Sequence, residues 1–333
     1  MKNNTNFLLG SVGRRATLLQ YIKNEWNGFG KLGGVDIYAD APGLGFVDMA
    51  RTIPPVKSDS YIDCILDLCS EWNIGCVTSL LDVETVAMSG IYETLLERNV
   101  LPLLPSHESS CICLDKLRFH NWLELHGLPS IPTYTPESAF SKLENKELLF
   151  PVFIKPRTGA GSVDSRRVDD VEGLVYFTCH SKSEMVVQPF IEGEDCNADA
   201  YTDCCSGEVV SVFMKRKRET RIGGASKTIS FFDPSLIELI EKLNEVFSFN
   251  GPVDMDFFRL PDGNYLVTEI NPRFGGSYLH AHACGLNFPA LIRNNLKGHI
   301  NPRDIGDYPV DVVMSMYDSI MVKRLSELPG GCR

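Results

Sequence analysis

The first hundred residues alternate short apolar runs with longer segments whose apolar positions recur at helical spacing. The apolar runs predict buried strands at 7–9, 35–39, 75–81 and 100–104. Helices are predicted around Leu18–Ile22 and over 60–72 and 83–98. Because strands and helices alternate, this part of the chain favours a parallel sheet with helices on its faces.

The pattern changes in the second part of the chain. A helix predicted over 115–126 is ended by Gly127 and Pro129, and further prolines punctuate the stretch after it. Strands of antiparallel character are predicted at 152–155, 185–187, 197–202, 208–214, 254–259 and 265–269, and helices at 168–180, 234–248 and 285–297. A parallel α/β part followed by an α+β part predicts two or three structural units, with a boundary near 105–115.

Composition and charge narrow the class of protein. The chain has 333 residues, of which 44% are hydrophobic and 23% charged, as in folded globular proteins. Its net charge of −11 argues against a protein that mainly grips nucleic acid or an anionic membrane. The 11 cysteines form no CxxC pair, which predicts reduced thiols, and no apolar run reaches the roughly 18 residues of a membrane span. We therefore expect a soluble cytoplasmic protein with neither a nucleic-acid nor a membrane partner.

Two glycines, Gly10 and Gly13, follow the first predicted strand, and Asp40 lies downstream. A dinucleotide-binding fingerprint needs three glycines and an acidic residue about 20 positions later. Here there are two glycines, and Asp40 lies 27 residues beyond Gly13, which disfavours an NAD-dependent enzyme. The pattern predicts a tight strand-to-helix turn, with an anion contact at the helix terminus as the alternative.

A lysine, Lys155, ends a predicted strand and is followed by a small-residue loop with Gly159, Gly161 and Ser162. Such a loop leaves backbone N–H groups free to approach an anion, and the lysine adds a mobile positive charge. The spacing does not match the P-loop motif. Taken alone, the segment is better explained as a surface hairpin with a flexible tip.

The strongest candidate for a metal site is a predicted hairpin with an Asp-Gly turn. On its second strand Glu269 and Asn271 share a face, and Asp256 on the first strand can lie beside them. These oxygen ligands suit Mg²⁺, and burying them without a cation would cost on the order of several kcal/mol. Arg273, just past the hairpin, would hold a phosphate or a substrate carboxylate. An exposed polar hairpin is the alternative.

In this order, the motifs resemble the ATP-grasp superfamily, and within it the carbamoyl-phosphate-synthase-like carboxylate–amine ligases. The segment 8–15 resembles the opening of the α/β domain that precedes the ATP-grasp fold, and 114–129 is similar to the first helix of that fold. Residues 152–162 resemble the family's lysine strand and phosphate loop, and 187–195 the hinge that seats adenine. The resemblance covers nearly the whole chain.

This resemblance implies a fold. We expect an amino-terminal parallel-sheet (pre-ATP-grasp) domain over 1–110 and an ATP-grasp domain over 111–333, with a mobile lid over about 116–185. It also implies ATP and Mg²⁺ as cofactors, with Mn²⁺ as an alternative ion. The implied nucleotide-binding residues are Lys116, Lys155, Gly159, Gly161, Ser162, Gln188, Pro189, Phe190, Ile191 and either Glu194 or Asp195, and the implied metal ligands are Asp256, Glu269 and Asn271.

The densest basic run of the sequence lies at 215–221, at the end of a predicted strand. Alternation puts Lys215 and Lys217 on one face of that strand. A solvated strand edge is one interpretation. In the other, Lys215 or Lys217 faces the triphosphate and Arg221 the acyl phosphate, and these three residues join Arg273 as the implied catalytic set.

The activity implied by the resemblance is an ATP-dependent ligation. A carboxylate would be activated as an acyl phosphate and joined to an amine, with release of ADP and phosphate. The partners would be a small-molecule acid and amine, with amino acids as candidates, and a homodimer is the assembly to test. A kinase-like phosphotransferase and a non-catalytic nucleotide-binding module are the alternatives.

Overall fold

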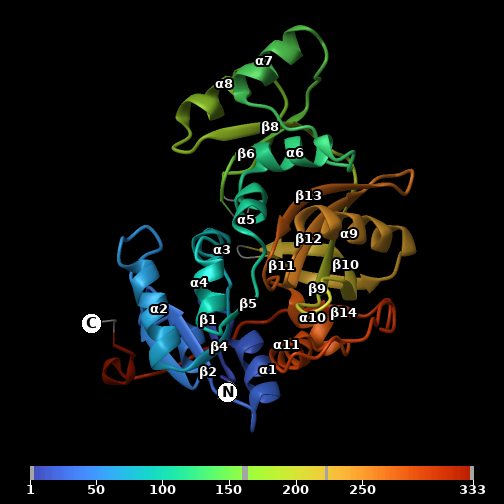
Figure 1. Cartoon of the computed structure of the whole chain (residues 1–333). Coiled ribbons are helices and arrows are strands. Elements are labelled where there is room, and N and C mark those ends of the chain that lie inside the picture. The colour runs from blue at the N-terminus through green and yellow to red at the C-terminus, as the bar shows by residue number, and fades with distance from the viewer. Residues whose placement is uncertain (1–3, 160–163, 222–223, 331–333) are drawn as a thin grey trace.

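The computed structural model describes residues 4–159, 164–221 and 224–330 of the chain. Its amino-terminal part is a five-stranded parallel sheet with the strand order β3-β2-β1-β4-β5 (Figure 1). The predicted parallel sheet is therefore confirmed. The elements of this part are β1 (Asn6–Gly10), α1 (Ala16–Trp26), β2 (Leu32–Asp36), β3 (Met49–Thr52), α2 (Tyr61–Glu71), β4 (Ile74–Ser79), α3 (Asp82–Ser89), α4 (Tyr92–Glu97) and β5 (Leu101–Pro102).

The glycine turn after β1 is bound to the end of β2 in this sheet. Gly13 adopts a φ of 45°, and its N–H donates to the Asp36 carboxylate at the end of β2 at 2.8 Å. A residue with a side chain rarely adopts this φ, so glycine fits the turn. The acid that holds the turn is thus Asp36, and not Asp40. The helix predicted over 83–98 is interrupted near Gly90 and forms α3 and α4.

A three-stranded antiparallel sheet, β7-β6-β8, forms a separate small unit that Figure 1 shows projecting at one end of the molecule. Apolar side chains of its two helices and its sheet, among them Ala139, Ile154 and Leu174, form a core of their own. We call this unit the lid. Two further helices, α5 (His107–Leu114) and α6 (Lys116–Leu125), connect it to the amino-terminal sheet. The lid contains α7 (Pro136–Glu144), β6 (Val152–Pro156), β7 (Arg166–Val168), α8 (Val171–His180) and β8 (Met185–Pro189).

The third unit is a six-stranded sheet with the order β13-β12-β9-β10-β11-β14. One of its faces is apolar and packs on α9, so that Met214 and Met255 share a buried core with Ile240. The strand β10 runs on through Arg221, so the basic run lies inside a strand and the prediction that it begins where the strand ends is wrong. The elements are β9 (Glu194–Thr202), β10 (Val209–Arg221), β11 (Gly224–Phe231), α9 (Pro234–Phe247), β12 (Gly251–Arg259), β13 (Tyr265–Asn271), α10 (Tyr278–Ala283), α11 (Phe288–Leu296) and β14 (Val313–Ser315).

The amino-terminal sheet and the carboxyl-terminal helices share one hydrophobic core. Phe7 and Leu18 pack in the same buried cluster as Tyr278 and Phe288. An ion pair between Glu25 of α1 and Arg293 of α11, with Oε1 and Nη1 2.7 Å apart, joins the same two parts nearer the surface. The two parts therefore hold each other in place without any help from the lid.

The cysteines are mostly free thiols. Cys69, Cys76, Cys113 and Cys196 are buried free thiols, as a small hydrophobic side chain would be. Cys64 is disulfide-bonded, so the expectation of reduced thiols throughout is wrong at that position. Across the described ranges of the chain, the helices are all too short or too polar to span a membrane.

Candidate active site

A cavity of about 590 Å³ lies between the lid and the six-stranded sheet. The lid strands β6 and β8 form one wall, and β9, β10, β12 and β13 form the other. Most residues predicted to bind the nucleotide line this cavity, although they come from distant parts of the sequence. They are Lys116, Lys155, Gly159, Gln188, Pro189, Phe190, Ile191 and Asp195, together with Lys217, Asp256 and Glu269.

Strand register explains why the sheet wall is polar. Asp256 pairs with Glu269 on β13 and with Asn197 on β9, and Asp254 pairs in the same way with Asn271 and Asp199. Residues that face each other across antiparallel strands, and residues two apart on one strand, point to the same side. These side chains therefore form one polar face, and the residues between them supply the apolar face against α9.

The polar face has two ends, an outer end and an inner end. The outer end borders the cavity and consists of Asp195, Lys217, Asp256 and Glu269. The inner end lies toward the amino-terminal sheet and consists of Asp199, Lys215, Asp254 and Arg273, all of which are buried. Asn197 bridges the two ends, since its Nδ2 donates to Asp254 at 2.8 Å and to Asp256 at 2.6 Å.

The predicted metal ligands lie close together at the junction of the two ends. Asp256 and Glu269 stand opposite each other, and Nδ2 of Asn271 lies 3.4 Å from the Asp254 carboxylate. Among the described residues no group of three or more His, Cys, Asp or Glu side chains is arranged to hold a metal. A magnesium ion here would rely on two carboxylates, one amide oxygen and oxygens from outside the chain, which is a common set for Mg²⁺. The donors present therefore fit a hard divalent ion.

Burial changes the acidity of these ligands in different directions. Burial raises the pKa of Glu269, while the nearby Lys116 and Lys155 partly oppose that rise. For Asp256 burial also acts upward, but the ammonium group of Lys217 outweighs it and the pKa is lowered. For both carboxylates, neighbouring cations oppose the effect of burial on the pKa.

Two lysines approach the cavity from the lid side. Lys116 opens α6, and its Nζ donates to the carbonyl oxygen of Gly159 at 2.9 Å. Lys155 stands on β6, where burial lowers its pKa to about 8, with repulsion from Lys116 adding to the effect and attraction from Glu269 opposing it. Lys155 forms no ion pair with a carboxylate of the described residues, so an anion placed beside it would stabilise its charge.

The loop that carries Gly159 is braced by an ion pair that the sequence did not suggest. Arg157 binds Asp115, the residue that caps α6, through three contacts of 2.7 to 3.0 Å. Such a bidentate pair fixes orientation as well as distance. It therefore ties the start of α6, and with it Lys116, to the end of β6. Gly161 and Ser162, also predicted to contact phosphate, lie outside the described residues.

The two lysines of β10 have different surroundings. Lys217 lies 2.8 Å from Asp256 and 3.1 Å from Asp195, at the edge of the cavity. Burial alone would lower the pKa of Lys217, but these carboxylates outweigh it and the pKa is raised. Lys215 is completely buried and forms an ion pair with Asp199. The structure therefore brings Lys217, and not Lys215, to the cavity.

The two acidic residues at the start of β9 lie on opposite faces of the sheet. Asp195 lines the cavity, whereas Glu194 lies on the other face, 3.2 Å from Nε of Arg216. Of the two residues left open as ribose acceptors, Asp195 is the one that lines the cavity. Arg221 closes β10.

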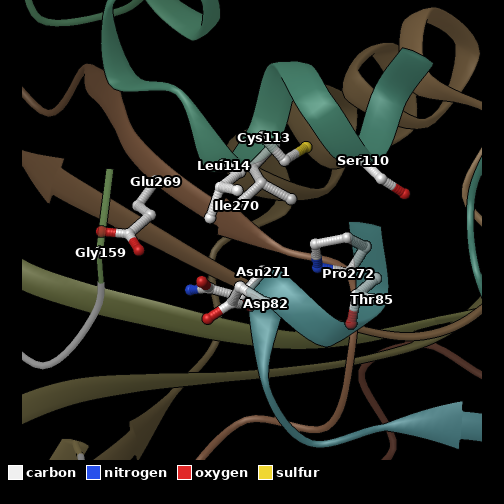
Figure 2. A pocket seen from close by; sticks show the side chains of 10 residues that line it. All are labelled: Asp82, Thr85, Ser110, Cys113, Leu114, Gly159, Glu269, Ile270, Asn271 and Pro272. Atoms are coloured by element: carbon white, nitrogen blue, oxygen red, sulfur yellow. The ribbon is translucent and has the colours of Figure 1, made fainter. Parts of the chain in front are cut away.

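Arg273 lies at the inner end and does not line the large cavity. Its Nε and Nη2 contact the carboxylate of Asp82 at 2.7 and 2.8 Å, and Asp82 opens α3 of the amino-terminal part. Beside this pair is a small cavity of about 10 Å³ between α3, α5 and β13, where Figure 2 shows Asp82 next to Asn271. Glu269 and Gly159 line both this cavity and the large one.

Sequence reasoning missed several of these residues. Asp195 was predicted, but Asn197 and Asp199 were missed, although the three recur every second position, which is a signal that one strand face is polar. Asp254 precedes Asp256 by two and carries the same signal. For Asp82 there was no local signal, because its partner lies 191 residues away in the sequence.

Comparisons with known proteins agree with this architecture. The family described as "PylC-like, N-terminal domain" matches residues 7–103, and the family described as "ATP-grasp domain" matches residues 113–277. The L-arginine-specific L-amino acid ligase of Bacillus subtilis is 25% identical over 194 residues, which cover 52% of this chain and 46% of that protein. The D-alanine–D-alanine ligase of Nitratidesulfovibrio vulgaris is 25% identical over 230 residues, covering 61% of this chain and 73% of the relative.

Solved structures share the fold. The N5-carboxyaminoimidazole synthetase of Staphylococcus aureus complexed with ADP superposes with a TM-score of 0.73 at 17% identity, covering 91% of this chain and 80% of that one. It, too, has a parallel-sheet domain followed by an ATP-grasp fold. The chain spans about half the length of the arginine-specific ligase and about three quarters of the D-alanine ligase.

Proposed function

Because the chain belongs to the ATP-grasp superfamily, we propose that it is an ATP-dependent ligase that joins a carboxylate to an amine. The observation that carries the proposal is the composition of the large cavity. Three lysines from three different elements, Lys116, Lys155 and Lys217, converge there on the carboxylates of Asp256 and Glu269. Several cations and acids around one cavity suit a triphosphate with a divalent ion.

The proposed nucleotide position follows from the distribution of polar and apolar groups. The hinge residues Gln188, Phe190 and Ile191 would hold the adenine, and the side chain of Gln188 is already oriented by its hydrogen bond to Thr133 at 2.7 Å. Asp195 would accept hydrogen bonds from the ribose. The phosphates would then lie toward the lysines and the metal ligands.

The metal ligands in this proposal are Asp256, Glu269 and Asn271, with Mg²⁺ as the ion and Mn²⁺ as the alternative. When bound, such an ion neutralises charge on the transferring phosphate. Lys155 and Lys217 would add positive charge on either side of the same phosphates. Arg273, on the loop just after Asn271, would orient the carboxylate or its acyl phosphate.

The proposed reaction has two steps. A carboxylate oxygen of the acid attacks the γ-phosphorus of ATP, the bond from that phosphorus to the β-γ bridging oxygen breaks, and ADP leaves. The amine nitrogen then attacks the carbonyl carbon of the acyl phosphate, the carbon–oxygen bond to phosphate breaks, and the nitrogen loses a proton to water. Both steps need positioning and charge neutralisation more than a nucleophilic side chain.

The proposed substrates are small molecules. Two relatives are named for amino acids, L-arginine in one and D-alanine in the other, so we propose an amino acid as the acid, the amine or both. The described cysteines other than Cys64 are free thiols, and on that ground we propose that the protein works in the cytoplasm. We propose a homodimer as its assembly. Sedimentation of the purified full chain tests the assembly.

A screen of amino acids and small acids, with ATP and Mg²⁺, tests the activity. ADP release that needs both an acid and an amine, with a condensed product seen by mass, supports ligation. A phosphorylated product formed without an amine would identify a phosphotransferase, and tight ATP binding without turnover a binding module. As a control on the metal site, the double variant Glu269→Ala with Asn271→Ala should lose turnover; unchanged turnover would show that the metal assignment is wrong.

A further inference from the structure

Arg273 is held by a residue from the other part of the molecule. One N–H on Nη2 donates to Oδ2 of Asp82 at 2.8 Å, and one on Nη1 donates to the carbonyl oxygen of Phe274 at 3.1 Å. Nε lies 2.7 Å from Oδ1 of Asp82, an ion-pair contact without hydrogen-bond geometry. We infer that Asp82 is a positioning residue for Arg273, so that the amino-terminal domain supplies part of the machinery for carboxylate activation. This inference rests on the proposed function.

The contacts around Arg273 show why it needs such a partner. The next carboxylate, that of Asp254, lies 3.9 Å from Nη1 and is already engaged by Asn197. Arg15 of the amino-terminal part donates to the carbonyl oxygen of Gly275 at 3.0 Å, which brings a second positive charge near Arg273. Like charges repel, and burial makes the repulsion stronger. Asp82 offsets that repulsion and fixes the plane of the Arg273 guanidinium.

The pairing leaves Arg273 able to bind an anion. Nη1 and Nη2 each use one N–H in these hydrogen bonds, so one N–H remains on each of the two terminal nitrogens. Two such donors match the two oxygens of a carboxylate or of an acyl phosphate. Because Arg273 is two residues from Asn271, a shift of its guanidinium would displace the acid from the proposed metal site.

A simpler role for Asp82 is to fasten the two parts of the molecule together. The ion pair of Glu25 with Arg293 provides the matched control, because it also joins the amino-terminal part to the rest of the chain but lies away from the cavities. If Asp82 only joins the two parts of the molecule, Asp82→Asn and Glu25→Gln should have the same effects on Arg273 and on the use of the acid. If Asp82 positions Arg273, the two variants should differ at Arg273 and in the use of the acid.

The first experiment reads Arg273 directly, without any substrate. The full chain is treated with phenylglyoxal, and modification of Arg273 is followed by peptide mass spectrometry. Releasing a buried charge-assisted pair should raise the rate of Arg273 modification by roughly tenfold in Asp82→Asn and leave it unchanged in Glu25→Gln. Equal rates in wild type and Asp82→Asn would overturn the inference. This reading holds whether or not the proposed ligation is correct.

The second experiment separates binding from positioning in the acid-dependent ADP release of the wild type. In Asp82→Asn, kcat/KM for the acid should fall by roughly 10- to 100-fold, while KM for ATP stays within about twofold. Asp82→Glu, which keeps the charge, should recover part of the loss, and Glu25→Gln should match wild type. A loss in Asp82→Asn that falls equally on ATP and acid, or that Glu25→Gln shares, would show a merely structural role. If the wild type shows no turnover, the proposed function fails, and the phenylglyoxal result still decides the role of Asp82.

Discussion

The two ends of the polar sheet face are built from the same residue types and are arranged in opposite ways. At the outer end Lys217 borders a cavity of about 590 Å³, and 14% of its side chain is exposed. At the inner end Lys215, two residues earlier on the same strand, has 0% exposure and is paired with Asp199. Both lysines lie on one side of β10, so alternation alone does not separate them.

The difference shows that the role of a charged side chain follows from its neighbours and not from its charge alone. Asp199 and Lys215 neutralise each other in the interior, and Arg273 forms an ion pair with Asp82. Lys215 is neutralised and closed to water, so it has little to offer a ligand, whereas the lysines around the cavity face open space. Arg273 differs from Lys215, because one N–H remains on each of its terminal nitrogens. We therefore propose that the outer end binds the phosphates, that Lys215 and Asp199 support the site, and that Arg273 orients the acid.

The largest expected effect comes from removing the inner lysine. In Lys215→Met the Asp199 carboxylate stays buried without its partner, so the free energy of unfolding should fall by about 3–5 kcal/mol. In Lys217→Met the fall should be about 1 kcal/mol, because its partners Asp195 and Asp256 border the cavity and are 42% and 21% exposed. Urea denaturation of the two variants compares them. Equal losses would remove the distinction between the two ends.

The next effect concerns ATP itself. In Lys155→Met the affinity for ATP should fall by roughly 10- to 100-fold, because a charge-assisted hydrogen bond to phosphate is lost. Stability should be unchanged, since burial already disfavours the charged form of this lysine. Calorimetric titration with ATP and Mg²⁺ measures the affinity. Arg218→Met is the control: it removes an exposed charge of the basic run and should bind ATP like wild type.

The pH dependence of ATP affinity also tests the role of Lys155. The pKa of Lys155 is lowered to about 8, so its ammonium group is charged at pH 7 and mostly neutral at pH 9. ATP affinity should therefore fall by roughly three- to tenfold between pH 7 and pH 9. Lys155→Arg keeps its charge over this range and should show a flat profile. A flat profile in the wild type would mean that Lys155 does not contact the nucleotide.

The smallest expected effect separates the two acids at the start of β9. Asp195 faces the cavity and Glu194 faces Arg216 on the other side of the sheet. In Asp195→Asn the affinity for ATP should fall by about two- to fourfold, through a weaker acceptor for the ribose hydroxyls. Glu194→Gln should leave the affinity as in wild type. The opposite order would mean that the hinge places the ribose differently.

Much of this architecture could be predicted from local patterns. The parallel sheet follows from alternating apolar runs, and the facing of Asp256, Glu269 and Asn271 follows from the period of a strand. What the sequence could not predict depends on contacts between distant residues. Lys215 and Lys217 look alike until the cavity is known, and the partner of Arg273 lies on a helix of another domain. The continuation of β10 through the basic run was missed because charged residues rarely signal a strand.

The central claim is that the carboxylate is activated through an acyl phosphate. The direct measurement uses an acid labelled with oxygen-18 in its carboxylate, with ATP, Mg²⁺ and the amine found by the screen. The proposed reaction transfers one labelled oxygen to the released phosphate, because the carboxylate oxygen that attacks the γ-phosphorus leaves with it. Phosphate that carries one oxygen-18 per product formed is the predicted result. Unlabelled phosphate released alongside the condensed product would contradict the account, because the carboxylate oxygen would then have left by a route other than an acyl phosphate.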